Sequence, residues 1–208
     1  MIESIFTPDQ KIIVLGGGPS LGEMDLEPIK SYPVIGTNAA VFLGDWVDII
    51  FWGDDRFYRW YPNALENFPN RVIHCATQYK DHPKFEYLEK VPAPEQTKKI
   101  DPIVWNKNKI AWFTNRGGNA GASAIALSLK LGAKQIILLG FDFKTKNGKH
   151  NYHSYHNHTP DKSIYQNKFL IHFERLAEET ERLGIQVINA TPDSALDVFP
   201  KNKLENLI

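Results

Sequence analysis

One short run of the chain holds four of its seven histidines. His150, His153, His156 and His158 all lie within residues 150–158. An imidazole is partly neutral near pH 7, so such side chains can act as general bases, phosphate contacts or metal ligands. Their spacing matches no standard zinc motif and no cysteine accompanies them, so we expect no metal here. The run predicts a catalytic or phosphate-contacting histidine; the alternative is a solvated polar loop.

A glycine-rich turn is the second candidate for chemistry. Gly16, Gly17 and Gly18 follow an apolar run and precede Pro19 and Ser20. Glycines let bare backbone N–H groups come close to a ligand, which indicates an anion or nucleotide site at the open end of a sheet. The turn matches neither the dinucleotide fingerprint nor the P-loop motif, so NAD and Walker-type phosphate binding are disfavoured. A tight turn without a ligand is the alternative.

Further polar or small residues stand where predicted strands end or helices begin. Asn38 follows one strand, where an amide can read a base edge or a ribose. Ala120 and Gly121 begin a predicted helix, where small residues let a ligand approach the helix N-terminus. Asp142 follows the strand before the histidine run. Each of these positions is also compatible with a turn or with close packing and no ligand.

Two adjacent acids follow another predicted strand. Asp54 and Asp55 would coordinate a cation on a nucleotide, or would cap the helix that begins near Arg56. The capping role is the commoner one for such a pair.

The elements that must position these residues alternate between strands and helices. The predicted strands are residues 12–15, 34–36, 47–53, 71–75, 135–139 and 185–189. The predicted helices are residues 120–131 and 164–183, with Gly132 and Gly184 as their stop signals. This alternation predicts an α/β fold, a single Rossmann-like domain over residues 1–208 with a mostly parallel sheet flanked by helices. Residues 82–112 predict an irregular, lid-like insertion, and residues 144–163 a histidine-rich loop.

The composition excludes several classes of protein. Of the 208 residues, 42% are hydrophobic and 23% charged, as in ordinary soluble domains. Lys plus Arg and Asp plus Glu each total 24, so the net charge of zero gives no strong nucleic-acid signal. The single cysteine, Cys75, forms no internal disulfide, the N-terminus lacks a signal-peptide pattern, and no apolar run is long enough for a membrane span. We therefore expect a cytoplasmic protein.

Aromatic residues gather in one part of the sequence, where they would suit either a core or a contact between copies in a homo-oligomer. They are Trp46, Trp52, Phe57, Tyr58, Trp60 and Tyr61.

The order of the motifs resembles a known family. VLGGGPSL at 14–21, TN at 37–38, NAG at 119–121, GAKQIILLGFDF at 132–143 and TPDSAL at 191–196 are together similar to the bacterial sialyltransferases of glycosyltransferase family 42. The same skeleton resembles archaeal 6-hydroxymethylpterin pyrophosphokinase-like proteins. The resemblance covers most of the chain outside residues 82–112, and its motifs are more specific for the fold than for the reaction.

The family resemblance implies roles for individual residues. The nucleotide contacts that it implies would be Gly16, Gly18, Ser20, Asn38, Ala120 and Gly121. Gly17, in the glycine turn, and Asp142, after the strand, are further candidate nucleotide contacts beside these. Tyr152 or Tyr155 would hold the leaving phosphate, and His153, His156 or His158 would be the base that activates the acceptor hydroxyl.

The sequence departs from the family pattern at three positions. Gly17 stands in place of an asparagine, Lys144 in place of a phosphate-contacting tyrosine, and Ala120 in place of a serine. Lys144 would still face a phosphate, but in a different way. These departures affect the identity of the sugar more than they affect the nucleotide site.

The leading hypothesis is a metal-independent glycosyltransferase that requires no cofactor. Its donor would be a nucleotide-activated sugar such as a CMP-sugar, with an unknown acceptor. The first alternative is an ATP-dependent pyrophosphokinase of the hydroxymethylpterin type, which needs Mg²⁺ and would use Asp54, Asp55 or Asp142 as ligands. The second alternative is a nucleotide-binding module without catalysis.

Overall fold

Short runs of β-branched and apolar residues form the strands, because a parallel sheet is buried on both of its faces. The computed structural model of the chain describes residues 5–92, 108–112, 119–155 and 165–208. In β1 (Lys11–Leu15) every residue after Lys11 is buried, and β8 (Gln135–Leu139) is buried after Gln135. The two strands pair in parallel along their whole length and lie inside the sheet.

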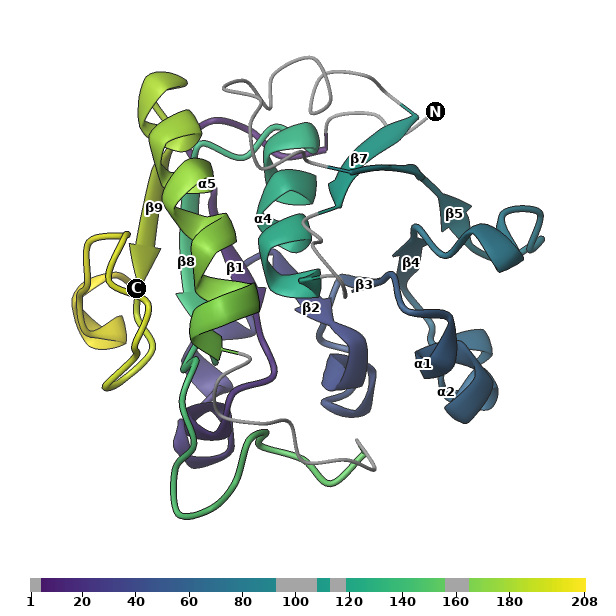
Figure 1. Ribbon diagram of the computed structural model, residues 1–208, viewed down its shortest axis with the longest axis horizontal. Helices are drawn as coiled ribbons and strands as arrows, with labels where there is room; N and C mark the ends of the chain where they lie inside the picture. Colours follow the sequence, from purple (N-terminus) through teal and green to yellow (C-terminus); the bar gives the residue numbers. More distant parts are fainter. Residues whose placement is uncertain (1–4, 93–107, 113–118, 156–164) are drawn as a thin grey trace.

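Seven parallel strands form one sheet in the order β5-β4-β3-β2-β1-β8-β9 (Figure 1). The other five strands are β2 (Val34–Thr37), β3 (Ile49–Trp52), β4 (Arg71–His74), β5 (Glu86–Tyr87) and β9 (Gln186–Asn189). The chain builds outward from β1 to β5 and later returns to the other side of β1 with β8 and β9. A second sheet pairs β6 (Glu89–Pro92) with β7 (Lys109–Trp112) in parallel.

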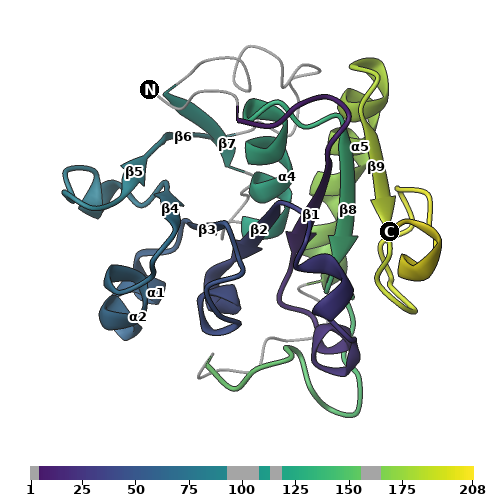
Figure 2. The same cartoon turned by 180° about the vertical axis from the view of Figure 1, so that it is seen from behind.

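Alternate residues of the strands enter two separate cores. Ile12 and Val14 pack in the core covered by α4 (Ala120–Lys130) and α5 (Ile171–Arg182), both in front of the sheet in Figure 1. Ile13 and Leu15 pack in the core on the opposite face, which is toward the viewer in Figure 2. That face carries η1 (Pro19–Glu23), η2 (Glu27–Ile29), η3 (Asn38–Phe42), α1 (Asp55–Trp60) and α2 (Pro62–Glu66). The described residues also form the short helices η4 (Thr77–Tyr79), the π-helical η5 (Tyr165–Leu170) and η6 (Leu204–Asn206).

The predicted α/β fold is confirmed. The six predicted strands correspond to β1, β2, β3, β4, β8 and β9, with ends that shift by one or two residues. Both glycines predicted to stop helices have left-handed backbone, with φ of 101° at Gly132 and 64° at Gly184. The second predicted helix is divided, because a π-helical turn precedes α5.

The segment predicted to be irregular, residues 82–112, contains regular structure in its described parts. The strand β5 extends the main sheet beside β4, and β6 pairs with β7. These strands have two to four residues, too short for a periodic pattern, and their pairing joins residues far apart in sequence. The sequence did not predict these short strands, and residues 93–107 of the predicted insertion lie outside the described residues.

The order of the strands marks one place at the edge of the sheet. The connections that leave β1 and β8 go to opposite faces of the sheet, and the carboxyl ends of such a pair of strands are the place where open α/β folds bind ligands. In Figure 1 these ends point downward, toward the loop that follows β8. Within the described ranges, no helix combines the length and the apolar character needed to cross a membrane.

Candidate functional site

The glycine turn after β1 is bonded to the neighbouring strand β8 and its turn. The N–H of Gly16 donates to the carbonyl of Leu139 at 2.8 Å, and the N–H of Gly18 donates to the carbonyl of Gly140 at 2.8 Å. Both amides, which the sequence suggested as nucleotide contacts, are thus used within the protein. The parallel ladder between β1 and β8 continues into the turns and fixes them to one another.

Asp142 fills the space beside the end of this turn. Its carboxylate accepts from the N–H of Ser20 at 3.0 Å and from the Ser20 hydroxyl at 2.8 Å, and only 1% of the residue is exposed. A Cβ on Gly18 would lie 1.9 Å from Oδ2 of Asp142, so this position requires glycine. Burial raises the pKa of Asp142, while the two hydrogen bonds from Ser20 oppose that rise. Ser20 and Asp142 hold each other.

Gly17 is the residue of the turn that faces the histidine-rich loop. Among the described residues, its N–H has no hydrogen-bond partner. A Cβ on Gly17 would lie 3.3 Å from Oδ1 of Asn151 and 4.0 Å from Nε2 of His153. Gly17, an amide side chain and an imidazole therefore lie together at the carboxyl edge of β1, at the place that the strand order marks. Asn151 was not a predicted site residue, although it lies inside the predicted histidine run.

The hydrogen bonding of His153 sets which of its nitrogens carries the proton. Its Nδ1 lies 3.2 Å from the N–H of Tyr155 and accepts from it. A neutral imidazole whose Nδ1 is an acceptor carries its proton on Nε2. Since Nε2 is the nitrogen that faces Gly17, His153 presents a hydrogen-bond donor to the site.

Tyr152 covers the turn from the loop side. Its N–H donates to the carbonyl of Gly17 at 3.2 Å, and its Cβ would lie 3.3 Å from a Cβ on Gly22. Its hydroxyl is buried and has no hydrogen-bond partner within the part of the chain that the structure describes. Burial raises the pKa of this hydroxyl, so it stays protonated and can donate. The predicted phosphate-holding role of Tyr152 is compatible with this position.

Tyr155 contacts a different part of the protein. Its ring stacks on Phe42 at a centroid distance of 4.0 Å, and its carbonyl accepts from the Tyr61 hydroxyl at 2.6 Å. The edge of the Phe42 ring also meets Tyr61, at 5.3 Å. Phe42 ends η3 and Tyr61 lies between α1 and α2, so these contacts hold the histidine-rich loop against the elements that follow β2 and β3.

Asn38 lies directly after β2 in a backbone conformation that side chains rarely adopt. Its φ is 46°, and its Oδ1 is buried without a hydrogen-bond partner among the described residues. An unpaired buried acceptor costs about 1–3 kcal/mol, and a ligand or a water molecule that bonds to it removes this cost. The role of Asn38 as a nucleotide contact stays a prediction, and its position after β2 is compatible with it.

The start of α4 is explained mainly by packing. Asn119 caps the helix, since its side chain accepts from the N–H of Ala122 at 3.1 Å. Ala120 is the first residue of the helix, and a Cβ on Gly121 would lie 2.8 Å from the Phe141 ring. Because Gly121 has no side chain, α4 can approach the turn after β8. The N-terminus of α4 therefore lies at the edge of the sheet that holds the site.

The tail of the chain fixes the turn after β8. The N–H of Phe141 donates to the Thr191 hydroxyl at 2.9 Å, and the Ser194 hydroxyl donates to the Phe141 carbonyl at 2.5 Å. The N–H of Ala195 donates to the Asp142 carbonyl at 2.8 Å. This tail is part of the family resemblance, although none of its residues was a predicted site residue. Lys144, a predicted phosphate contact two residues beyond Asp142, is exposed.

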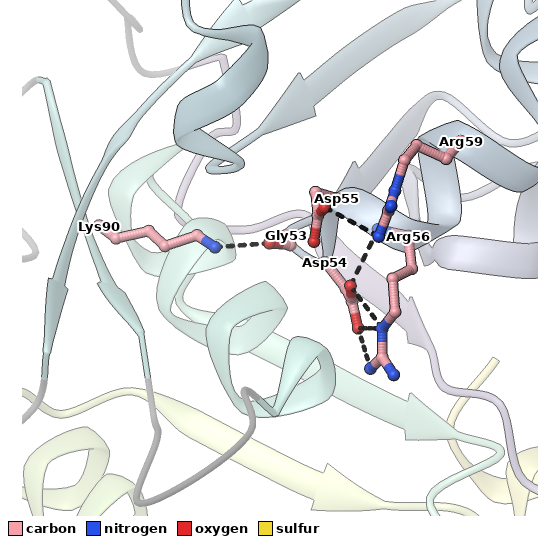
Figure 3. Close-up of polar contacts among 6 residues, drawn as sticks. All are labelled: Gly53, Asp54, Asp55, Arg56, Arg59 and Lys90. Atoms are coloured by element: carbon pink, nitrogen blue, oxygen red, sulfur yellow. Dashed lines mark hydrogen bonds and ion pairs between the residues drawn. The ribbon is translucent and has the colours of Figure 1, made fainter.

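The two acids after β3 are paired with arginines of the helix that follows them (Figure 3). Asp54 caps α1 by accepting from the N–H of Arg56 at 3.0 Å, and it also binds the Arg56 guanidinium. Burial tends to raise the pKa of Asp54, but the hydrogen bonds from Arg56 lower it overall. Asp55 pairs with Arg59 at 3.2 Å, one turn further along. The predicted capping of this helix is confirmed for Asp54.

A buried aromatic cluster stands at the ends of β3 and β4. The rings of Trp52 and His74 stack at 4.7 Å, and Tyr58, Tyr79 and Phe85 surround them. Both residues are fully buried, and neither Nε1 of Trp52 nor the two ring nitrogens of His74 has a partner in the described residues. Burial first, and then the nearby charges of His82 and Lys90, lower the pKa of His74 to about 4.

Two of the predicted histidines, His156 and His158, lie outside the described residues. Among the residues that are described, no group of three or more His, Cys, Asp or Glu side chains is arranged to hold a metal ion. Of the remaining loop histidines, His153 lies at the site, whereas His150 stacks on Tyr165 and contacts its hydroxyl at 3.0 Å.

Comparison with known proteins gives matches in structure but not in sequence. No protein-family model matches the chain, and no curated protein matches its sequence. The sialyltransferase CstII from Campylobacter jejuni, in complex with cytidine-5'-monophosphate, superposes with a TM-score of 0.57 at 19% identity, over 93% of this chain and 85% of that one. The chain has the fold of the sialyltransferase CstII.

Two further structures support the same conclusion. CstII in complex with CMP-3FNeuAc superposes with a TM-score of 0.58 at 17% identity, over 92% of this chain and 86% of that one. The MAf glycosyltransferase from Magnetospirillum magneticum AMB-1 gives a TM-score of 0.63 at 16% identity, over 97% of this chain but 35% of that one. The expected resemblance to the family 42 sialyltransferases is therefore confirmed at the level of the fold.

Proposed function

We propose that the chain is a glycosyltransferase that takes a sugar from a nucleotide-activated donor, such as a CMP-sugar. The observation that carries this proposal is the position of Gly17 beside the Asn151 side chain and the Nε2 of His153, at the carboxyl ends of β1 and β8. Ligands of open α/β sheets bind at this place. The two CstII structures, which contain CMP and CMP-3FNeuAc, support the choice of donor.

The reaction would transfer charge to the departing nucleotide. The bond between the anomeric carbon of the sugar and the phosphate oxygen breaks, and the acceptor hydroxyl oxygen forms the new bond to that carbon. Negative charge grows on the phosphate, and donors already aimed at it lower the barrier. The N–H of Gly17 and the Nε2–H of His153 would be these donors, and the buried hydroxyl of Tyr152 would be a third.

The proton of the acceptor hydroxyl would pass to a second histidine. His153 is poorly suited to receive it, because its Nδ1 accepts from the backbone and its Nε2 already carries a proton. The base of the proposed reaction would therefore be His156 or His158, in keeping with the prediction that one histidine of this loop serves as the general base.

Substitutions of His153 separate the two roles. Gln offers an N–H near the position of Nε2 but cannot take a proton, whereas Ala offers neither. We expect His153→Gln to keep turnover within about tenfold of the wild type and His153→Ala to lose on the order of 10²–10³ in kcat, the loss typical of one transition-state donor. Equal and complete loss in both variants, with nucleotide binding intact, would return the role of base to His153.

Substitutions of His156 and His158 test the base itself. Replacing the true base by Ala should lower kcat by about 10²–10⁴ without changing the affinity for the nucleotide. Each variant is assayed for donor turnover and separately for nucleotide binding. If both variants keep full turnover, the assignment of the base is wrong.

A thermal-shift screen tests the donor. We would compare CMP, CDP, UDP, GDP, ATP and pterins, because a ligand at 100 times its Kd stabilises a fold by about 2.7 kcal/mol. Stabilisation by CMP supports a CMP-sugar donor, whereas stabilisation by ATP and a pterin supports the pyrophosphokinase alternative. Nucleotide binding without product from any donor supports the non-catalytic alternative.

A chelator distinguishes the leading proposal from the pyrophosphokinase. That reaction needs Mg²⁺ to shield the phosphates, and its ligands would be Asp54, Asp55 or Asp142. All three carboxylates already bind protein groups, namely Arg56, Arg59 and Ser20. We expect turnover to be unchanged by EDTA, and activity that disappears with EDTA and returns with Mg²⁺ would favour the pyrophosphokinase.

A further inference from the structure

A row of aromatic side chains leads from the candidate site toward the solvent. The ring of Tyr152 meets the imidazole of His153 at a centroid distance of 4.7 Å, and His153 meets the ring of Tyr155 at 5.4 Å. Tyr155 in turn stacks on Phe42 at 4.0 Å. Rings at these separations are in contact. The hydroxyl of Tyr152 is buried at one end of the row, whereas Phe42, at the other end, is 37% exposed.

Phe42 is held in place by the protein itself. It ends η3, whose residues Ala39–Val41 are buried. Its ring stacks on Tyr155 and meets Tyr61 at 5.3 Å with the ring planes nearly perpendicular. The Tyr61 hydroxyl donates to the Tyr155 carbonyl at 2.6 Å, which ties the three aromatic residues together. A ligand that stacks on Phe42 therefore has little side-chain freedom to remove.

The position of Phe42 gives its exposure a meaning. Among the described residues, the large hydrophobic side chains that are exposed are those of Ile5, Phe42 and Trp60. Single exposed side chains of this kind are common and need no ligand. Phe42 has a further property, because Tyr155 joins its ring to the imidazole of His153 at the candidate site.

His153 stands between the proposed nucleotide site and the outer part of this row. Its Nε2 lies 4.0 Å from the position of a Cβ on Gly17, and its Nδ1 accepts from the N–H of Tyr155 at 3.2 Å. With the nucleotide on the Gly17 side, the acceptor must approach from another side for its hydroxyl to reach the anomeric carbon. Tyr155 and then Phe42 extend from the Nδ1 side of the imidazole, so they are available to the acceptor.

An exposed aromatic ring at this place suits one class of ligand. The face of the ring is apolar and carries the negative part of its quadrupole. The C–H groups on one face of a pyranose, a six-membered sugar ring, are apolar and weakly positive, so the two faces attract each other. A lipid chain needs a larger apolar surface than one ring, and the exposed loop residue next to Tyr155, Ser154, is polar.

We propose that Phe42, held by Tyr155 and Tyr61, binds a pyranose ring of the acceptor and is a specificity-determining residue of the transfer. An acceptor whose sugar ring has an uninterrupted C–H face is favoured, and an open-chain polyol is not. The inference rests on the proposed function, because it takes the bound sugar to be the acceptor. Binding of the sugar itself can be measured without catalysis.

Saturation-transfer NMR on the wild type gives the first test. The probes are methyl β-glucopyranoside, methyl β-galactopyranoside and methyl α-mannopyranoside, and the control is mannitol, a polyol without a ring. The full chain is deuterated except at its phenylalanines, so that saturation starts on phenylalanine rings. We expect transfer to the C–H protons on one face of at least one pyranoside and none to mannitol.

Two results of this NMR experiment contradict the proposal. One is the absence of transfer to all three pyranosides, both without a nucleotide and with the nucleotide that the thermal-shift screen identifies. The other is transfer to mannitol that equals transfer to the pyranosides. Neither result depends on a variant that must fold.

Variants assign the bound sugar to Phe42. Phe42→Leu keeps an apolar side chain and removes the ring, so we expect the Kd for the pyranoside to rise by about fivefold. Phe42→Tyr keeps the ring and should stay within about twofold of the wild type. Trp60→Leu is the matched control, because it removes another exposed ring and should leave the Kd unchanged. A folded Phe42→Leu with wild-type affinity overturns the proposal, as does equal weakening in Trp60→Leu.

Tyr61→Phe separates stacking on Phe42 from an indirect effect of the histidine-rich loop. This variant removes the hydrogen bond to the Tyr155 carbonyl and leaves the Phe42 ring in place. Direct stacking predicts that the pyranoside affinity is kept, even where hydrogen exchange at Tyr155 accelerates. A loss of affinity as large as in Phe42→Leu would mean that the loop, and not the Phe42 ring, determines binding, and would overturn the proposal.

Turnover distinguishes this inference from the proposed function. For an acceptor that is glycosylated, Phe42→Leu should raise the KM more than it lowers kcat, and water should consume a larger share of the donor. Nucleotide binding without affinity for any pyranoside keeps the proposed function and overturns this inference. Pyranoside binding at Phe42 without nucleotide binding or transfer rejects the glycosyltransferase and leaves Phe42 as a sugar-binding residue.

Discussion

Two corners lie at the carboxyl edge of the sheet, one at the ends of β3 and β4 and the other at the ends of β1 and β8. Their acidic side chains are bonded in different ways. After β3, Asp54 and Asp55 bind arginines two and four residues further along the same short helix. After β8, Asp142 binds Ser20, which lies 122 residues away in sequence. The first arrangement forms in any chain that makes this helix, but the second exists only when the whole sheet is assembled.

The same contrast applies to the groups that each corner leaves unused. At the β3–β4 corner, the unpaired nitrogens of Trp52 and His74 are sealed among aromatic rings. At the β1–β8 corner, the open side of Gly17, where a Cβ would stand, faces the polar side chains of Asn151 and His153. The unpaired groups of the first corner are therefore closed off by packing, and the second corner is the one suited to bind a ligand.

A matched pair of glycine variants should give the largest effect on this comparison. In Gly18→Ala the new Cβ would lie 1.9 Å from Asp142 and 2.7 Å from the Gly140 carbonyl, which is backbone and cannot turn away. We expect a loss of about 3 kcal/mol in the free energy of unfolding. In Gly17→Ala the nearest atom is at 3.3 Å, so stability should change by less than about 1 kcal/mol.

Urea unfolding measures both stabilities, and calorimetry measures nucleotide binding by Gly17→Ala. Because its methyl group would point at Asn151 and His153, this variant should fold normally and bind nucleotide more weakly. Similar stability of the two variants would show that the close contacts of Gly18 do not require a glycine at that position.

The free energy of unfolding should depend on pH through His74, at the β3–β4 corner. The pKa of His74 is about 4 in the folded protein and near 6.5 when the chain is unfolded. Below pH 6.5 the unfolded chain gains a proton that the folded His74 does not, so stability falls between pH 6.5 and 4. Over this pH range, His74 should lower the free energy of unfolding by about 3 kcal/mol.

His74→Phe tests this effect because Phe can stack on Trp52 and cannot titrate. The free energies of unfolding of wild type and variant are measured in urea at several pH values. The two values should be similar near neutral pH and should diverge as the pH falls, because the variant is less sensitive to acid. Parallel pH profiles of the two proteins would show that His74 does not carry the dependence.

The aromatic contacts that join the two corners should have an intermediate effect. Phe42→Ala removes the stacking partner of Tyr155, worth about 0.5–1.5 kcal/mol beyond its buried area. The histidine-rich loop should then open more often, and hydrogen exchange at Tyr155 and its neighbours should accelerate while β1 and β8 stay protected. Tyr61→Phe is the milder control, since it removes one hydrogen bond and keeps the ring. Unchanged exchange in the loop of Phe42→Ala would contradict the role of this contact.

The smallest effect should come from Asp54. Asp54→Ala removes a helix cap and an exposed ion pair, for a loss of about 1 kcal/mol in stability. Nucleotide affinity and the response to EDTA should match those of the wild type. If Asp54→Ala folds but loses activity, Asp54 belongs to the functional site and is not only a helix cap.

The sequence was sufficient for features set by neighbouring residues. The buried strands β1 and β8, the glycine stops at Gly132 and Gly184, and the capping by Asp54 all follow from patterns within a few residues. The glycine turn and the described part of the histidine run, residues 150–155, also lie at one edge of the sheet as expected, because parallel strands bring their carboxyl ends together.

Features that depend on distant contacts were not predictable. The bond between Asp142 and Ser20 uses up two groups that the sequence suggested for the nucleotide, and nothing near either residue indicates it. The state of His153 depends on the N–H of Tyr155, which a residue pattern does not specify. The short strands β6 and β7 likewise depend on pairing across a long segment.

The hydroxyl of Tyr152 has a consequence for the energetics of recognition. A polar group on an open surface must lose its hydration before it can bond to a ligand, and this loss cancels most of the gain. The protein has already removed water from this hydroxyl on folding and gives it no partner among the described residues. An acceptor atom that reaches this hydroxyl would thus gain nearly the full free energy of the new hydrogen bond. The protein without a ligand is less stable by the cost of burying the unpaired hydroxyl.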